Sequence, residues 1–295
     1  MKYQQFLDTI KTHMETKLNS GQKIAIQQVT KNNGTVYDGL FIVDPIRNVS
    51  PTIYLNPYYH RYLNGVSMED ILEDILTTYY KHLPKQDFDV SVFTDFSKAK
   101  ERIVMKLINR RRNETLLKNV PFIPYMDLAI VFVCTVTDFL DEYATILIHH
   151  QHLKLWNIGP EELYQIAMCN SPNRMPYTFE SMENILVHLT NQRLPIFEQI
   201  PMYVLTNRLK VHGASCIVYP GLLGSLAKTL DSNLLIIPSS IHEVLIIPEK
   251  DAFSEYSYAD YEDMIREVNE TQLTDDEILG DHIYLYHKDT GIIDF

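Results

Sequence analysis

Cysteine is scarce in this chain of 295 residues, and so are the patterns that usually mark a binding site. The three cysteines, Cys134, Cys169 and Cys216, are far apart and form no Cys-x-x-Cys pair. We therefore expect reduced thiols, and neither a disulfide framework nor a cysteine-based metal centre. No glycine-rich loop has the spacing of a phosphate-binding motif, and no cofactor is expected.

Long apolar runs are also missing. The longest apolar run, residues 128–136, has the length of a strand. No run in the sequence approaches the length of about 18 apolar residues that suggests a membrane span. Residues 1–8 are amphipathic and lack the apolar centre of a secretory signal. These absences predict a cytoplasmic protein without membrane contact.

The charge that is present is strongly segregated along the chain. The formal net charge is −12. Residues 249–281 hold twelve acidic side chains against Lys250 and Arg266, whereas residues 98–118 hold eight basic side chains against two acidic ones. The overall acidity argues against direct nucleic-acid binding. The two blocks could face each other, contact a partner, or form solvated helix faces.

The spacing of apolar residues predicts an α+β fold with mixed or antiparallel sheets and flanking helices, because strands and helices do not alternate regularly. Ser67 is expected to cap one helix, and Pro160 to begin another. A helix is expected at residues 3–18, with Phe6, Ile10, Met14 and Leu18 on one stripe. Further helices are expected at residues 97–112, 179–191, 220–230 and 258–269. Strands are expected at 23–30, 35–43, 52–55, 127–136, 143–150, 202–206, 215–219, 234–237, 244–247 and 282–288.

The domain organisation is open to two interpretations. Residues 1–295 can form one unit, or they can form two α+β subdomains, 1–118 and 119–295. The boundary would fall in residues 111–125, where charged residues precede Pro121 and Pro124 and the periodicity is weak.

The most suggestive chemistry lies in Pro238-Ser239-Ser240-Ile241-His242-Glu243, a polar bend between two apolar strands. Ser240, His242 and Glu243 supply a hydroxyl, an imidazole and a carboxylate, and Asp127 at a strand end could join them in a hydrolase or metal-dependent site. Triad members normally converge from distant segments, and no nucleophile-elbow pattern surrounds either serine. The alternatives are a bend whose side chains cap nearby backbone groups, and a small-ligand pocket.

Histidines form a second cluster at His149, His150 and His152. If this segment is a strand end, His150 and His152 share a face and are weak candidates for metal ligands. No metal site is expected, because a third ligand would have to come from elsewhere, His242 being the conceivable one.

Five segments resemble a bacterial family of unknown function that is common in anaerobic gut Firmicutes and has no assigned activity. The resemblance covers nearly the whole chain, which implies one family-length unit, and it suggests an accessory or defence-related role. It carries over no catalytic residue. The segments are residues 48–56, 102–109, 202–207 with Gly213-Ala214, Tyr219-Pro220 leading to 238–244, and 266–272.

Charge segregation without a recognisable catalytic motif favours a non-enzymatic protein that binds a protein partner. The alternative is the hydrolase or metal-dependent enzyme centred on residues 239–243. The candidate partner-binding residues are Arg110, Arg111 and Arg112 in the basic block and Asp260, Glu262, Asp263 and Glu267 in the acidic block.

Overall fold

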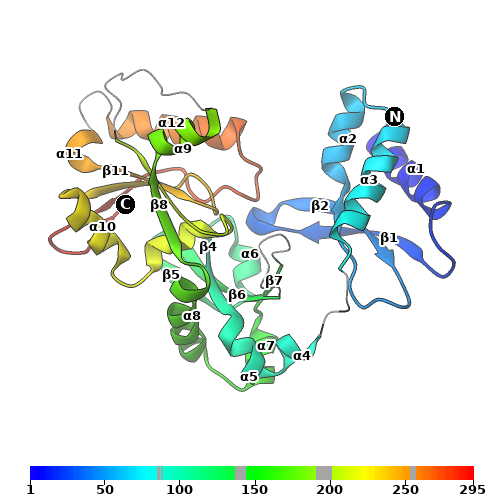
Figure 1. Ribbon diagram of the computed structural model, residues 1–295, viewed down its shortest axis with the longest axis horizontal. Coiled ribbons are helices and arrows are strands. Elements are labelled where there is room, and N and C mark those ends of the chain that lie inside the picture. Colours follow the sequence, from blue (N-terminus) through cyan, green and yellow to red (C-terminus); the bar gives the residue numbers. More distant parts are fainter. Residues whose placement is uncertain (85–86, 88, 137–143, 191–200, 253–256) are drawn as a thin grey trace. The chain divides into compact units, whose positions relative to one another are not determined.

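The computed structural model describes residues 1–84, 87, 89–136, 144–190, 201–252 and 257–295. Contacts between residues divide the chain into two compact units, each of which is described by itself (Figure 1). Unit 1 comprises Met1–Lys31 and Thr35–Val90, and unit 2 comprises Asn32–Gly34 and Ser91–Phe295. The division falls before residue 91 rather than after 118, because strand β4 (Ile103–Asn109) pairs along its length with β6 (Leu128–Thr135).

Unit 1 is a three-stranded antiparallel sheet packed against helices. Strand β1 (Lys23–Thr30) pairs with β2 (Val36–Val43), which also pairs with β3 (Ile53–Tyr54). The helices are α1 (Tyr3–Glu15), α2 (Leu55–Leu63) and α3 (Met68–His82). The predicted stripe of α1 is buried in the core through Phe6, Ile10 and Met14. Ser67 caps α3 as expected, since its side chain accepts from the Asp70 N–H.

Two antiparallel sheets form the framework of unit 2 (Figure 1). In the first sheet, β6 pairs with β4, with β5 (Phe122–Tyr125) and with β7 (Thr145–Leu147). The second has the order β13-β12-β10-β11-β9-β8. Its strands are β8 (Tyr177–Ser181), β9 (Tyr203–Asn207), β10 (Leu234–Ile237), β11 (Val244–Pro248), β12 (Tyr284–Tyr286) and β13 (Ile293–Asp294).

Helices surround these sheets, and the α+β class predicted from the sequence is confirmed. Helix α8 (Pro160–Arg174) packs against β4, with Pro160 at its first turn. Helix α12 (Tyr258–Thr271) buries Tyr261 and Ile265 against β10 and β11. The others are α4 (Ser91–Thr94), α5 (Phe96–Ala99), η2 (Lys100–Arg102), α6 (Glu114–Leu117), α7 (His150–Trp156), α9 (Met182–Thr190), η3 (Gly213–Val218), α10 (Leu222–Leu230) and α11 (Glu249–Ala252), with η1 at Asn32–Gly34.

Several predictions of secondary structure were wrong. Residues 103–109 form a strand and not a helix. Strand β4 is buried on both faces, and its apolar residues, interrupted only by Lys106, therefore do not alternate with polar ones as a half-buried strand would. Residues 215–219 belong to η3 and the residue after it, not to a strand. The 179–191 helix begins only at Met182, after strand β8. Within the described residues, none of the helices combines the length and apolar character needed to cross a membrane.

Candidate functional site

The bend between β10 and β11 is closed by its own polar groups. The Ser240 N–H donates to the Glu243 carbonyl at 3.1 Å, and the Ser240 hydroxyl oxygen accepts from the His242 N–H at 3.0 Å. Ser240 is buried. Among the hydrogen bonds of the described residues, none joins the Ser239 or Ser240 hydroxyl to the His242 ring. These contacts provide no serine–histidine pair for the hydrolase interpretation, and Ser240 instead caps the bend.

The His242 ring lies against a second histidine. Its Nδ1 accepts from the His212 backbone N–H at 3.3 Å, and the two rings stack with centroids 6.0 Å apart. Its Nε2 lies 3.8 Å from Glu277 Oε1. Burial lowers the pKa of His242, although the Glu277 carboxylate opposes this effect. Burial raises the pKa of Glu243, with Lys210 opposing it. His242 is therefore mainly neutral at pH 7.

Gly213 allows this close packing. A Cβ atom at Gly213 would lie 2.1 Å from Thr206 Oγ1 and 2.4 Å from the His242 carbonyl oxygen. The same Thr206 hydroxyl donates to that carbonyl at 2.7 Å. Burial also lowers the pKa of His212 well below its ordinary value, and the charges of Lys106 and His242 add to the effect. The two histidines are thus a neutral pair held by backbone packing.

Asp127 belongs to a different cluster, with His282 and Tyr284. The Tyr284 hydroxyl donates to Asp127 Oδ1 at 2.9 Å, and His282 Nε2 lies 3.6 Å from the same oxygen. On its other side, His282 Nδ1 lies 3.1 Å from Asp281 Oδ1. The carboxylate predicted to assist His242 therefore contacts another histidine, 155 positions further along the chain than Asp127.

Neighbouring charges and hydrogen bonds set the protonation states of His282 and Asp127 in this second cluster. The nearby Asp127 carboxylate raises the pKa of His282 to about 9 against the effect of burial, and Asp281 adds to the rise. Burial alone would raise the pKa of Asp127, but the nearby His282 and the hydrogen bond from Tyr284 outweigh it and lower that pKa. His282 is consequently a protonated group between two carboxylates at pH 7, and a general base is not available in this form.

The histidine cluster at 149–152 begins helix α7 and is not a strand face. The His149 N–H donates to His152 Nδ1 at 2.9 Å, and the His152 ring packs against Phe93. Burial lowers the pKa of His152, and His149 adds to this. His150 is exposed. Among the residues that the structure describes, no group of three or more His, Cys, Asp or Glu side chains could hold a metal ion.

Asparagine side chains hold residues 275–280 in place, a feature that the sequence analysis missed. Their amides donate to successive backbone carbonyls of this segment, which we call the strap. The segment is irregular, so these amides supply partners that a helix or sheet would otherwise provide. The bonds are Asn33 to Asp275 and Ile278 (both 2.7 Å), Asn32 to Asp276 (2.8 Å), Asn109 to Leu279 (3.0 Å) and Asn269 to Gly280 (2.9 Å).

Arg110, Arg111 and Arg112 form an exposed turn after β4, which we call the arginine turn. The backbone of this turn is fixed: the Arg110 N–H donates to the Asp127 carbonyl at 3.1 Å, and the Arg112 N–H donates to Asn109 Oδ1 at 2.9 Å. Among the ion pairs of the described residues, none involves these three guanidinium groups. The predicted 97–112 helix is wrong, so the arginines extend from a turn and not from a helix end.

The arginine turn and the acidic strap meet at η1, within unit 2. Asn113, which directly follows the turn, donates through Nδ2 to Asn33 Oδ1 at 2.8 Å. Asn33 in turn donates to the Asp275 carbonyl at 2.7 Å. The basic and acidic blocks are therefore neighbours in space.

Several acidic side chains of α12 are used within the helix. Asp260 accepts from the Ser257 N–H and hydroxyl, both at 2.7 Å, and so completes a capping box. Asp263 lies 2.6 Å from Arg266, and Glu262 lies 4.0 Å from it. Glu267 is exposed. Of the four predicted acidic contact residues, three thus have partners inside the helix or its cap.

A family model matches residues 3–288 of the chain: a family of unknown function, DUF5688. No curated protein and no solved structure matches the chain. Because the match extends over nearly the whole sequence, the chain belongs to this family, and the resemblance to a family of unknown function is confirmed.

Proposed function

We propose that this member of DUF5688 is a protein-binding protein, and that the arginine turn and the neighbouring strap form its contact surface. The observation that carries the proposal is the link from Asn113 through Asn33 to Asp275. This link holds three exposed guanidinium groups beside an acidic segment without neutralising them. A surface with both signs of charge, side by side, favours a partner with the complementary arrangement.

The rigidity of the turn supports this proposal. Binding through a mobile arginine side chain is weakened by the entropy lost on ordering, and a fixed backbone reduces that loss. Asn109 and Asn113, which are 8% and 1% exposed, anchor both ends of the turn through hydrogen bonds. Arginine is also the cation best suited to a carboxylate partner, because its planar group can donate two parallel hydrogen bonds.

The net charge of unit 2 limits the chemical class of the partner. Unit 2 carries 28 acidic residues against 17 basic ones, so a uniformly anionic polymer such as nucleic acid would be repelled over most of its surface. A protein that presents carboxylates to the arginine turn and basic side chains to Asp275 avoids this repulsion. The proposed partner is therefore a protein with a mixed-charge surface.

The cellular setting is part of the same proposal. The resemblance to the family suggests a bacterium of the anaerobic gut Firmicutes and an accessory or defence-related role, and the lack of long apolar runs led us to expect a cytoplasmic location. These expectations direct the search for a partner to a cytosolic lysate of such a bacterium, prepared at low salt because contacts between exposed charges weaken as salt rises.

A three-way pull-down tests the proposal. The baits are wild type, a turn variant with Arg110→Gln, Arg111→Gln and Arg112→Gln, and a control with Lys11→Gln, Lys17→Gln and Lys228→Gln. Both variants lose the same charge, and all six side chains are exposed. We expect a protein that is retained by wild type and by the lysine control and lost with the turn variant. Equal recovery of the protein on all three baits would count against the arginine turn as a contact surface.

A further inference from the structure

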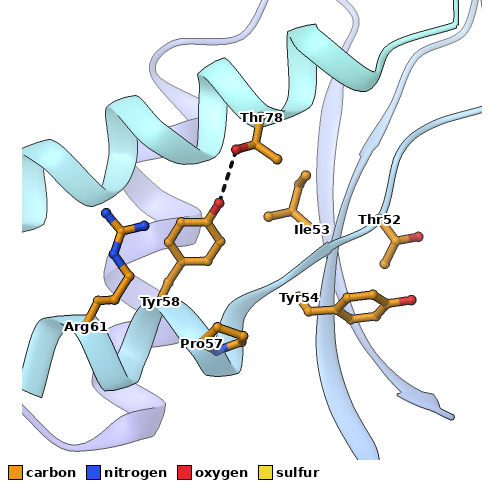
Figure 2. A pocket seen from close by; sticks show the side chains of 7 residues that line it. All are labelled: Thr52, Ile53, Tyr54, Pro57, Tyr58, Arg61 and Thr78. Carbon is orange, nitrogen blue, oxygen red and sulfur yellow. Dashed lines mark hydrogen bonds between the residues drawn. The ribbon is translucent and has the colours of Figure 1, made fainter. Parts of the chain in front are cut away.

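Unit 1 contains a cavity that the charged surface of unit 2 does not explain. It measures about 370 Å³ and lies between β3, α2 and α3 (Figure 2). This volume falls within the roughly 300–1,000 Å³ of small-molecule sites. Its walls include Tyr54, Pro57 and Tyr58, with the buried Ile53 beside them. Three rings around an apolar side chain favour a flat, apolar ligand.

The aromatic walls are held in place by neighbouring side chains. Lys31 Nζ lies 4.4 Å from the centre of the Tyr54 ring, and the Tyr37 ring lies 5.4 Å from it. The Arg61 guanidinium carbon lies 5.5 Å from the centre of the Tyr58 ring. A ligand that enters would therefore meet walls that are already ordered, which reduces the entropy lost on binding.

The polar atoms at the cavity define which ligand it takes. Arg61 is paired with Asp74, so the cavity offers no uncompensated charge. The Thr78 hydroxyl lies 3.4 Å from Asp74 Oδ1, a carboxylate that can only accept, so Thr78 donates its one proton there. The Tyr58 hydroxyl lies 3.3 Å from Thr78 Oγ1 and must then be the donor of that bond, drawn in Figure 2. The Tyr58 oxygen keeps its lone pairs as acceptors.

We infer that this cavity is a binding site for a small uncharged aromatic ring that carries an N–H or O–H donor, of the indole or phenol class. The ring packs against Tyr54, Pro57 and Tyr58, and its donor bonds to the Tyr58 hydroxyl oxygen. The site is separate from the proposed contact surface, because every residue that lines it belongs to unit 1.

Titration of the full chain with indole and with 1-methylindole, followed by NMR, tests the inference. Indole should bind with a dissociation constant of ~0.1–1 mM, typical of a small ligand in a pocket. 1-Methylindole lacks the donor and should bind about fivefold more weakly, the value of one hydrogen bond. The variant Tyr58→Phe keeps the ring and should bind both compounds equally.

Two tyrosine variants serve as a matched pair. Tyr54→Ala removes a wall and should weaken indole binding about tenfold, whereas Tyr80→Ala removes an exposed ring of α3 outside the cavity and should leave it unchanged. The inference is overturned if wild type shows no saturable shift with indole, or if Tyr58→Phe still distinguishes the two compounds.

Discussion

Asn33 and Asn113 bond to each other in both directions: the Asn33 N–H donates to Asn113 Oδ1 at 2.8 Å, and Asn113 Nδ2 donates to Asn33 Oδ1 at 2.8 Å. They are 80 positions apart in sequence. Asn113 also donates to the Asn109 carbonyl at 2.8 Å, and Asn33 donates to the strap. This pair therefore connects the arginine turn to the acidic residues beside it.

Asn113→Asp should destabilise unit 2 by about 2–4 kcal/mol. The substitution keeps the shape but removes two donors and places a carboxylate, 1% exposed, against the Asn109 carbonyl. Urea unfolding followed by fluorescence of Trp156, the single tryptophan, measures the change. Asn119→Asp is the control, because Asn119 is exposed and its side chain donates one long hydrogen bond, of 3.4 Å, to the Thr115 carbonyl. Equal stability of the two variants would contradict the role given to Asn113.

Gly213→Ala should destabilise unit 2 by about 2–4 kcal/mol, because its Cβ would collide with Thr206 Oγ1 at 2.1 Å and with the His242 carbonyl at 2.4 Å. Relief of that collision requires β9 or the bend to move. The control is Gly159→Ala, where the nearest atom is 3.7 Å away. The same urea experiment should give a much smaller change for the control, and a similar change in both would refute the packing argument.

Stability should fall as the pH rises from about 6.5 to about 9, through loss of the proton on His282. The pKa of His282 is about 9 in the folded protein, above its ordinary value of 6.5. The contribution of protonated His282 to the free energy of unfolding is therefore complete below pH 6.5 and is lost as the pH rises past 9. The loss should be about 1–2 kcal/mol, less than the full shift implies, because the side chain is 26% exposed.

The variant His282→Gln isolates this contribution. Its unfolding free energy should change less than that of wild type between pH 6.5 and 9.5, and His150→Gln, at an exposed histidine of α7, should follow wild type. If the unfolding free energy of His282→Gln falls with pH as steeply as that of wild type, the loss of stability at alkaline pH comes from other groups.

Asp260→Lys should disturb the start of α12 even when no partner is present. Asp260 accepts two hydrogen bonds from Ser257 and lies in the first turn, where a negative charge is favoured by the helix dipole. Hydrogen exchange should speed up at the amides of residues 258–262. Glu267→Lys, in the exposed part of the same helix, should leave these amides unchanged. Protection that is the same in both variants would show that Asp260 is free to serve a partner.

The local pattern of the sequence predicted much of the framework. The stripe Phe6, Ile10 and Met14 and the cap at Ser67 are where the spacing placed them, because each depends only on neighbours within one or two turns. The error at β4 has the opposite cause. The spacing of four apolar residues matches a helical stripe: Ile103, Val104, Leu107 and Ile108. The segment is nevertheless a strand buried on both faces, because tertiary contacts and not local spacing decide between helix and strand here.

The candidate sites were harder to predict, because their members are distant in sequence. Asp127 was correctly noted as a carboxylate at a strand end. Its partner His282 could not be identified, because it precedes β12 in the other sheet of unit 2 and only tertiary packing brings the two side chains together. The alternation of His282 and Tyr284 towards one side of an extended segment was the available signal. Nothing local distinguishes Asn33 or Asn113 from an ordinary turn asparagine.

The affinity of the recovered partner is the decisive test of the arginine turn as a contact surface. The dissociation constant of that protein should be measured by calorimetry for wild type, the Arg110–Arg112 glutamine variant and the lysine control, each at low and physiological salt. We expect the turn variant to bind at least about tenfold more weakly, the lysine control to match wild type, and the difference to shrink as salt rises. Equal affinity of the turn variant and wild type at low salt would contradict this expectation.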